Sequence, residues 1–328
     1  YQLARMIFND PSSTPEQTAQ ALERLTKAAE AGQDCAQYAL GKIYRDGQGV
    51  EKDIQKAVAL FTLAATKENS FAAFALGKLY LAGDAALPRD PAAALKWLTY
   101  AAELGNQFAQ YRLGKLLLKG DDGIPKDVIT AIRWLTAAAK QENGYAEYVL
   151  ALVYLTGEDA PKDSVKALSL LKRSAGRGNQ FAQYRLGKLL LQGEDAPKDV
   201  KAAIRWLTAA AEQGNQYAQY ALGKLYLLGK EVPKDRSSAI KWFQLAADQG
   251  NEYAQYFLKH MDDRLGQPPV AAVISLFHHL ANIFQEQNQP PPSGGVRVAV
   301  DRKLLRKIKA KKIAQGHKAD DHEPEMQL

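Results

Sequence analysis

Apolar residues recur along the chain with the period of a helix that buries one face. In the stretch that begins at Phe108, the apolar positions are Ala109, Leu113, Leu116 and Leu117, spaced at i, i+4 and i+7 or i+8. A turn that contains glycine ends this run, and a second helical run follows it. The pattern therefore predicts pairs of amphipathic helices joined by short turns.

The tripeptide Pro-Lys-Asp precedes most of the second helices. Proline stops the preceding segment from continuing, and the aspartate carboxylate accepts hydrogen bonds from the free amides of a new helix. We predict N-caps at Asp53, Asp90, Asp127, Asp163, Asp199 and Asp235. Most second helices end at a glycine, which adopts the left-handed conformation that closes a helix. Glu68 and Gln141 break this glycine pattern, and the sequence before Tyr145 predicts a locally irregular loop.

These helix pairs form one array of internal repeats. An aromatic residue before a Leu-Gly pair recurs at intervals of 36 or 37 residues, at Tyr1, Tyr38, Phe74, Tyr111, Tyr148, Tyr184, Tyr220 and Tyr256. A two-helix unit is too small to bury its own apolar face, so neighbouring units must stack into a right-handed superhelix. A glycine in each first helix, replaced by Ala151 in one unit, predicts a close approach of the paired helices: Gly41, Gly77, Gly114, Gly187 and Gly223.

The motif Ala-x-Tyr-x-Leu-Gly-x-x-Tyr, followed by Gly-x-x-x-Pro-Lys-Asp and then by Ala-x-x-Trp-x-x-x-Ala-Ala-x-x-Gly-Asn, resembles Sel1-like repeats, which are relatives of the tetratricopeptide repeat. The resemblance covers residues 1–260. It implies an all-α fold, a right-handed α/α superhelical solenoid of about seven helix-turn-helix repeats. It also implies a non-catalytic scaffold that binds a partner protein or peptide.

Two further segments follow the array. Residues 261–289 carry Val270, Ile274 and Phe277 at helical spacing, which predicts an amphipathic helix that caps the end of the solenoid. The alternative is a docking helix for another protein. Residues 290–328 begin with Pro290-Pro-Pro-Ser-Gly-Gly, which indicates a linker before a polar tail.

The positive charge of the chain lies mostly in this tail. Nine basic and five acidic side chains follow residue 290, a net charge of +4, so residues 1–289 carry about +3 of the total of +7. The alternative function is therefore nucleic-acid binding through the basic tail. The candidate residues are Arg302, Lys303, Arg306, Lys307, Lys309, Lys311 and Lys312.

The end of the chain also resembles the C-terminal region of conjugative-transposon mobilisation proteins. The residues that carry this resemblance are His278-His279, the proline linker, the run from Val300 to Lys309, and Gly316-His-Lys-Ala-Asp-Asp-His-Glu. In those proteins a Sel1-repeat region follows an N-terminal relaxase domain of the MobA/MobL type. Because the sequence opens inside a repeat, we expect Tyr1 to be a cut within a longer protein, with any DNA-nicking relaxase upstream of it.

Catalytic, metal and cofactor sites are not indicated. The five histidines show no zinc-ligand spacing, and the group His317, Asp320, Asp321 and His322 is typical of a solvated tail. Cys35 has no neighbour that would lower its thiol pKa, so we expect it to pack. A single cysteine favours a reducing, cytoplasmic location, and no run of apolar residues is long enough to span a membrane. We expect no enzyme activity in this region, and the oligomeric state stays open.

The candidate binding site is a stripe on the first helix of each unit. Positions three before and four after the anchoring aromatic share its face, and by similarity to tetratricopeptide arrays they would line a concave groove. Rings that alternate with ammonium groups suit an extended peptide with acidic residues. The predicted residues are Tyr38, Lys42, Phe74, Lys78, Phe108, Tyr111, Arg112, Lys115, Phe181, Tyr184, Arg185, Lys188, Tyr217, Tyr220 and Lys224.

A second interpretation of the stripe stays open at this point. Repeated aromatics at helical spacing also stack between neighbouring repeats, in which case the lysines are solvated and bind nothing. Leu152 interrupts the row of lysines and argues against one continuous track.

Overall fold

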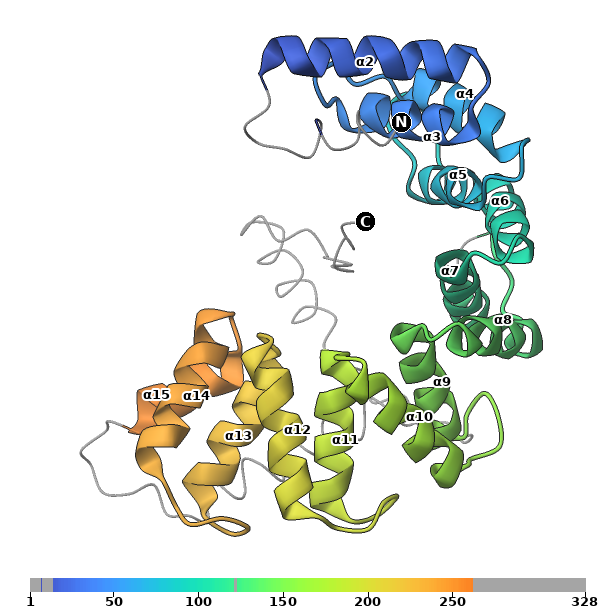
Figure 1. Cartoon of the computed structure of the whole chain (residues 1–328). Helices are drawn as coiled ribbons and strands as arrows, with labels where there is room; N and C mark the ends of the chain where they lie inside the picture. The colour runs from blue at the N-terminus through green and yellow to red at the C-terminus, as the bar shows by residue number, and fades with distance from the viewer. Residues whose placement is uncertain (1–6, 8–13, 121–122, 262–328) are drawn as a thin grey trace, which may run out of the picture. The chain divides into compact units, whose positions relative to one another are not determined.

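The structure, a computed structural model, describes residue 7 and residues 14–120 and 123–261 (Figure 1). The chain divides into one unit of residues 1–262 and another of residues 263–328, and the described residues all belong to the first. The helices of this unit are α2 (Pro15–Glu30), α3 (Asp34–Asp46), α4 (Ile54–Ala65), α5 (Ser70–Ala82), α6 (Pro91–Glu103), α7 (Gln107–Lys119), α8 (Val128–Lys140), α9 (Gly144–Thr156), α10 (Ser164–Gly176), α11 (Gln180–Gln192), α12 (Val200–Glu212), α13 (Gln216–Leu228), α14 (Arg236–Asp248) and α15 (Glu252–Met261).

Consecutive helices pack as antiparallel pairs, and each pair packs on the next. The odd-numbered helices from α3 are the first helices of the repeats, and the even-numbered helices from α4 are the second. In Figure 1, α5 and α7 lie on the inner side of the curve that these repeats follow, with α6 and α8 outside them. The predicted all-α solenoid is confirmed, because residues 14–120 and 123–261 contain helices and turns and no strand, only isolated bridge residues such as the pair Asp84 and Leu87.

The six predicted aspartate N-caps are confirmed. Each carboxylate accepts the backbone N–H three residues further on, as Asp163 does from Lys166 at 2.9 Å. The backbone N–H of the same aspartate donates to a carbonyl near the end of the preceding helix, as from Asp163 to Tyr154 at 2.9 Å. The cap residue therefore starts one helix and ties it to its partner.

The irregular loop predicted before Tyr145 is wrong. Glu68 and Glu142 adopt the left-handed conformation, with φ of +62° and +67°, at the position where other repeats have glycine. The residue that departs from the glycine pattern is thus Glu142 rather than Gln141. The turn keeps its usual hydrogen bond, from the Asn143 N–H to the Ala138 carbonyl at 3.1 Å, so the regular backbone geometry overrides the unfavourable residue.

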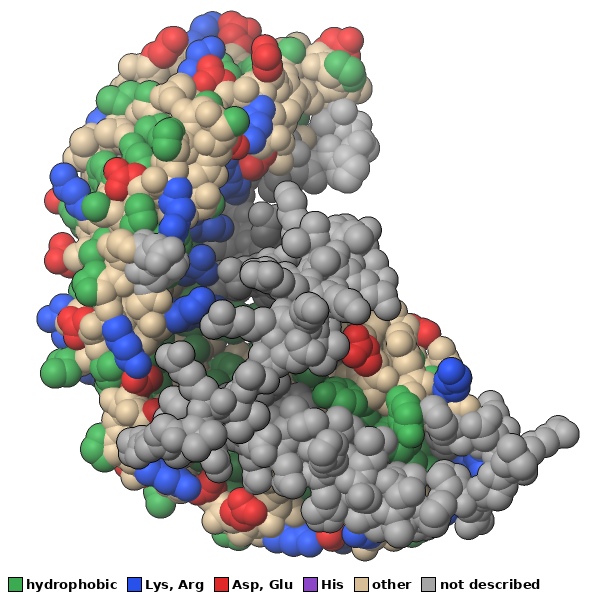
Figure 2. All heavy atoms as spheres, turned by 180° about the vertical axis from the view of Figure 1, so that it is seen from behind, with side chains coloured by type: hydrophobic (Ala, Val, Ile, Leu, Met, Phe, Trp, Pro, Cys, Tyr) green, Lys and Arg blue, Asp and Glu red, His purple; other side chains and the backbone are tan. Residues whose placement is uncertain are grey.

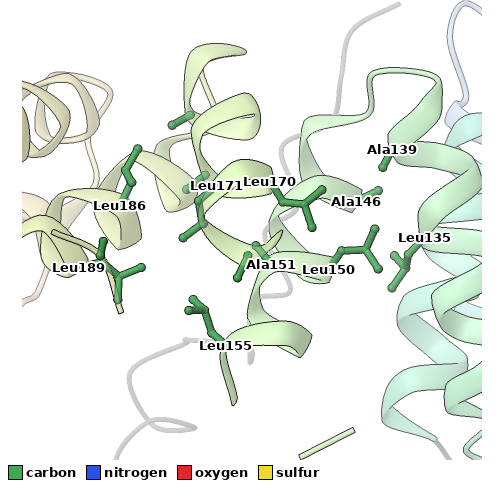
Figure 3. Packing of buried hydrophobic residues seen from close by; sticks show 14 of the residues in the cluster. Leu135, Ala139, Ala146, Leu150, Ala151, Leu155, Leu170, Leu171, Leu186 and Leu189 are labelled. Carbon is green, nitrogen blue, oxygen red and sulfur yellow. The ribbon is translucent and has the colours of Figure 1, made fainter. Parts of the chain in front are cut away.

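The close helix approach predicted at the repeated glycines is confirmed. A Cβ added to Gly187 would lie 2.7 Å from Cγ of Leu207 on the paired helix, and one added to Gly114 would lie 2.6 Å from Cγ of Leu135. In the repeat of α9 and α10, the methyl group of Ala151 is itself fully buried. Figure 3 shows side chains from α8, α9, α10 and α11 meeting in one cluster around this residue.

The lysines of three Pro-Lys-Asp turns, and Lys52 of the equivalent Glu-Lys-Asp turn, form a row of ion pairs along the array. Each joins its own turn to the corresponding turn of the next repeat, with N–O distances of 2.6–2.8 Å. The pairs are Lys52–Asp84, Lys126–Asp159, Lys162–Asp195 and Lys198–Glu231. Because these lysine side chains are about half exposed, each pair contributes only about 0–1 kcal/mol.

The amphipathic segment predicted at residues 261–289 begins at the last described residue and otherwise lies outside the described part of the chain, as does the tail of residues 290–328. Between residues 14 and 261, apart from 121 and 122, no helix combines the length and apolar character needed to cross a membrane.

Candidate functional site

An asparagine, buried in every case but Asn69, positions the first helix of most repeats. The side chains of Asn69, Asn106, Asn143, Asn179 and Asn215 accept backbone N–H groups in the first turns of α5, α7, α9, α11 and α13. The sequence analysis passed over these caps, although the recurring Gly-Asn pair marked them. Because the caps lie at equivalent positions, they set the aromatic and basic side chains of successive repeats at the same rotation about the helix axis.

The aromatic residues of the stripe form pairs across every junction from α3 to α15. The anchor ring of one repeat lies against the ring three positions before the next anchor, with centroids 5.9–6.4 Å apart. The pairs are Tyr38–Phe71, Phe74–Phe108, Tyr111–Tyr145, Tyr148–Phe181, Tyr184–Tyr217 and Tyr220–Tyr253. The rings therefore pack against one another between repeats at tilted angles of 31–43°, which agrees with the second interpretation of the stripe.

Stacking does not bury these rings completely. Tyr217 keeps 51% of its surface exposed, Phe71 43% and Phe181 37%. The anchors are more enclosed, and burial raises the pKa of the Tyr184 and Tyr220 phenols. Each junction thus has a half-buried anchor ring that holds two repeats together and, at these three sites, an exposed ring beside it.

The lysines of the stripe lie close to protein rather than in free solution. The Lys78 ammonium is 5.8 Å from the Phe74 ring centroid, within cation–π range. The Lys188 side chain reaches the surface, yet desolvation and then the charge of Arg185 lower the pKa of its ammonium. Desolvation also lowers the pKa of Lys224, followed by the charges of Lys188 and Lys230. These shifts show that burial, and then neighbouring positive charge, disfavour the charged form of both ammonium groups.

Two arginines add positive charge next to the rings. Arg112 and Arg185 follow the anchors Tyr111 and Tyr184 directly and are half-buried. The Nε of Arg185 is buried and has no hydrogen-bond acceptor in the described part of the chain. In Figure 2, Lys and Arg side chains follow one another along one edge of the repeats. We call the fifteen predicted stripe residues, from Tyr38 to Lys224, the basic aromatic face.

The repeat of α9 and α10 interrupts this face. Val149 stands where its neighbours have arginine, and Leu152 stands where they have lysine. The same repeat carries a fully buried carboxylate, Glu147, at the position of a glutamine in most other repeats. Arg173 and Arg177 of α10 pair with Glu147 at 2.6 and 3.4 Å. This buried pair is a feature that the sequence analysis missed.

The remaining sequence expectations have separate outcomes. Cys35 is exposed rather than packed, because the position at the start of α3 where other repeats carry an aromatic ring is only partly covered. This partial burial, and then the charge of Asp34, raise the pKa of its thiol. Across residues 14–120 and 123–261, no three His, Cys, Asp or Glu side chains gather as metal ligands. The basic tail residues and the group from His317 to His322 lie outside the described residues.

Comparison with known proteins agrees with the repeat architecture. The Sel1 repeat model matches seven segments, residues 1–33, 36–69, 70–106, 107–143, 144–179, 180–215 and 216–251. No curated protein matches the chain. Among solved structures, the protective antigen c5321 of uropathogenic Escherichia coli, described as displaying an SLR fold, is 34% identical with a TM-score of 0.69. The match covers 81% of this chain and 57% of c5321.

A Sel1 repeat protein from Oxalobacter formigenes is similar to the same extent. It is 32% identical with a TM-score of 0.68, and the match covers 80% of this chain and 75% of that protein. The repeat model accounts for nearly all of residues 1–251, which contain all but the last of the helices described above. The chain therefore belongs to the Sel1 repeat family.

Proposed function

We propose that the repeats bind an extended, acidic segment of a partner protein along the basic aromatic face. Proteins built from Sel1 repeats generally act as protein–protein interaction scaffolds. The observation that carries the proposal is the composition of the face. At the anchor and at the positions three before, one after and four after it, α3 to α13 carry seven cations and no acidic residue.

The chemistry of these positions suits such a partner. Carboxylates form charge-assisted hydrogen bonds with guanidinium and ammonium groups, and exposed rings such as Tyr217 offer apolar contact to the rest of a peptide. Pairing also removes the repulsion between Lys188 and Lys224. Stacking of the rings between repeats is compatible with this role, because it holds the exposed rings and the cations in a fixed row.

The test is binding of a fluorescent, glutamate-rich peptide to two charge-reversed variants. One carries Lys115→Glu, Lys188→Glu and Lys224→Glu on the face. The matched control has the same net charge but carries Lys96→Glu, Lys172→Glu and Lys201→Glu, which are exposed on α6, α10 and α12. The face variant loses affinity by more than tenfold and the control by less than about threefold, since screened surface charges act weakly over distance. Equal loss in both variants rejects the face as the site.

Two further proposals, on the parent protein and on its cellular location, rest on the sequence. The resemblance of the last residues to mobilisation proteins supports a role for these repeats within a DNA-transfer protein. The single cysteine, Cys35, supports a cytoplasmic location.

The alternative function is nucleic-acid binding by the tail, supported by its density of basic residues. The 328-residue chain with Lys307, Lys309 and Lys311 changed to Gln separates the two functions. If the tail binds DNA, this variant loses a steeply salt-dependent DNA affinity and keeps its peptide affinity.

A further inference from the structure

The basic aromatic face is divided into two basic clusters by an apolar centre. Arg112 and Lys115 lie on α7, and Arg185 and Lys188 lie on α11. Between them α9 presents Val149 and Leu152 at the corresponding positions, both half-buried. Since the four positions are equivalent by repeat alignment, the interruption is a change of side-chain chemistry on an unchanged backbone.

Aromatic rings complete the apolar centre on both sides. Tyr145 of α9 pairs with Tyr111 of α7 at 6.0 Å, and Tyr148 of α9 pairs with Phe181 of α11 at 6.2 Å. Val149 and Tyr148 also pack against the buried cluster beneath α9. Two cationic side chains of this repeat, Arg173 and Arg177, are held by Glu147, so these two do not supply the charge that α9 lacks.

The spacing of the two clusters follows from helix packing. The repeats place α9 between α7 and α11, and these helices meet mainly through the ring pairs at 6.0 and 6.2 Å. Helices that pack directly lie about 8–10 Å apart, so the upper value applies here and the clusters are about 20 Å apart. An extended peptide advances about 3.3 Å per residue, so this separation corresponds to about six residues.

We infer that the face selects a peptide with two acidic clusters about six residues apart and a large apolar residue midway between them. This inference rests on the proposed function and adds the pattern of the partner. The acidic clusters pair with Arg112 and Lys115 on α7 and with Arg185 and Lys188 on α11. The apolar side chain lies over Val149 and Leu152, where a carboxylate would lose its hydration without gaining a cation.

Three synthetic peptides test the pattern by fluorescence anisotropy with the full chain. The first has two pairs of glutamates about six residues apart with a central leucine; the second replaces this leucine with glutamate; the third keeps the leucine but brings the glutamate pairs about three residues closer. Burial of one leucine is worth at least about 1.5 kcal/mol, so the first peptide binds about tenfold tighter than the second. The third binds about tenfold more weakly than the first, because it reaches only one cluster.

A variant that restores the interrupted pattern gives the decisive comparison. Val149→Arg with Leu152→Lys copies the residues that the neighbouring repeats carry, so the fold has already accommodated them. This variant binds the central-glutamate peptide more tightly than the central-leucine peptide, a reversed preference. The control Val165→Lys adds charge to the same repeat on α10, at a side chain that is 83% exposed, and keeps the original preference.

The outcomes separate this inference from the proposed function. If all three peptides bind equally and the restored variant changes nothing, the pattern is wrong while acidic-peptide binding stands. If no acidic peptide binds, both proposals are rejected.

Discussion

The ion pair of Glu147 leads to an asymmetric prediction for stability. The Glu147 side chain is fully buried, whereas the side chains of its partners Arg173 and Arg177 are 49% and 32% exposed. Removal of the arginines leaves a carboxylate inside the protein, and removal of the carboxylate leaves arginines that turn into water. The two changes therefore have very different costs, although both break the ion pairs with Glu147.

The structure also sets the magnitudes. Arg173→Met with Arg177→Met keeps much of the apolar packing of the side-chain stems but leaves Glu147 unpaired, which costs about 3–5 kcal/mol. Glu147→Gln costs about 1 kcal/mol or less. In the repeat of α7, Gln110 donates its Nε2 to the Ala102 carbonyl at 3.0 Å. The Ala139 carbonyl, now bonded by Arg173 at 3.2 Å, is the equivalent acceptor for a glutamine at position 147.

Urea unfolding followed by far-ultraviolet circular dichroism measures these differences, with hydrogen exchange in α9 and α10 to localise them, because repeat arrays do not always unfold in one step. Adding Glu147→Gln to the double arginine variant recovers most of the lost stability. Arg205→Met, at an exposed position of α12, is the control for loss of an arginine. A double arginine variant no less stable than Glu147→Gln would refute the reasoning.

Three further predictions concern the backbone, the packing and the pH dependence. Glu68 adopts a left-handed conformation that glycine tolerates better, so Glu68→Gly raises the unfolding free energy by about 0.5–1 kcal/mol in urea titrations. An unchanged unfolding free energy would show that φ of +62° causes no strain at this residue. Gly187→Ala forces a methyl group against Leu207 and lowers the unfolding free energy by about 1–3 kcal/mol. In a variant that already carries Leu207→Ala, the same glycine change costs less, because the clashing side chain is gone; if the costs of the two changes simply add, the contact is ruled out. Because the pKa values of Lys188 and Lys224 lie below 10.5, acidic-peptide affinity measured by anisotropy falls before the pH reaches 10.5, while their unfavourable charge contribution to folding is relieved over the same interval. Affinity that stays constant up to pH 10.5 would exclude these lysines.

The parts of the fold that sequence predicts well depend on local rules. An aspartate cap such as Asp163 needs only the amides of its own helix. Gly187 is likewise explained by one contact within its own helix pair, the close approach of Leu207. Local rules also explain the error at Glu68 and Glu142. A residue that disfavours the left-handed conformation predicts a different turn, but the helices on both sides impose the conformation and accept its cost.

The candidate site was only partly predictable because its contacts join different repeats. The residues on the face followed from helical spacing, but the pairing of Tyr111 with Tyr145 depends on how α7 and α9 stack, which no single repeat specifies. Glu147 had the appearance of an ordinary solvated helix residue. Its burial follows from the position it shares with Gln110, where other repeats bury an amide.

The departures of the α9–α10 repeat support one another when they are considered together. Loss of the arginine and lysine at Val149 and Leu152 removes charge from the face, while Glu147 and its two arginines add a charged cluster within the same repeat. Glu147, Arg173 and Arg177 all belong to this repeat, and Arg177 also pairs with Glu142 at the end of the preceding repeat at 2.9 Å. Since a buried ion pair requires fixed geometry from both of its helices, it suits a repeat whose position must be well defined. The repeat that would recognise the centre of a partner thus also carries an ion pair that fixes the geometry of its two helices.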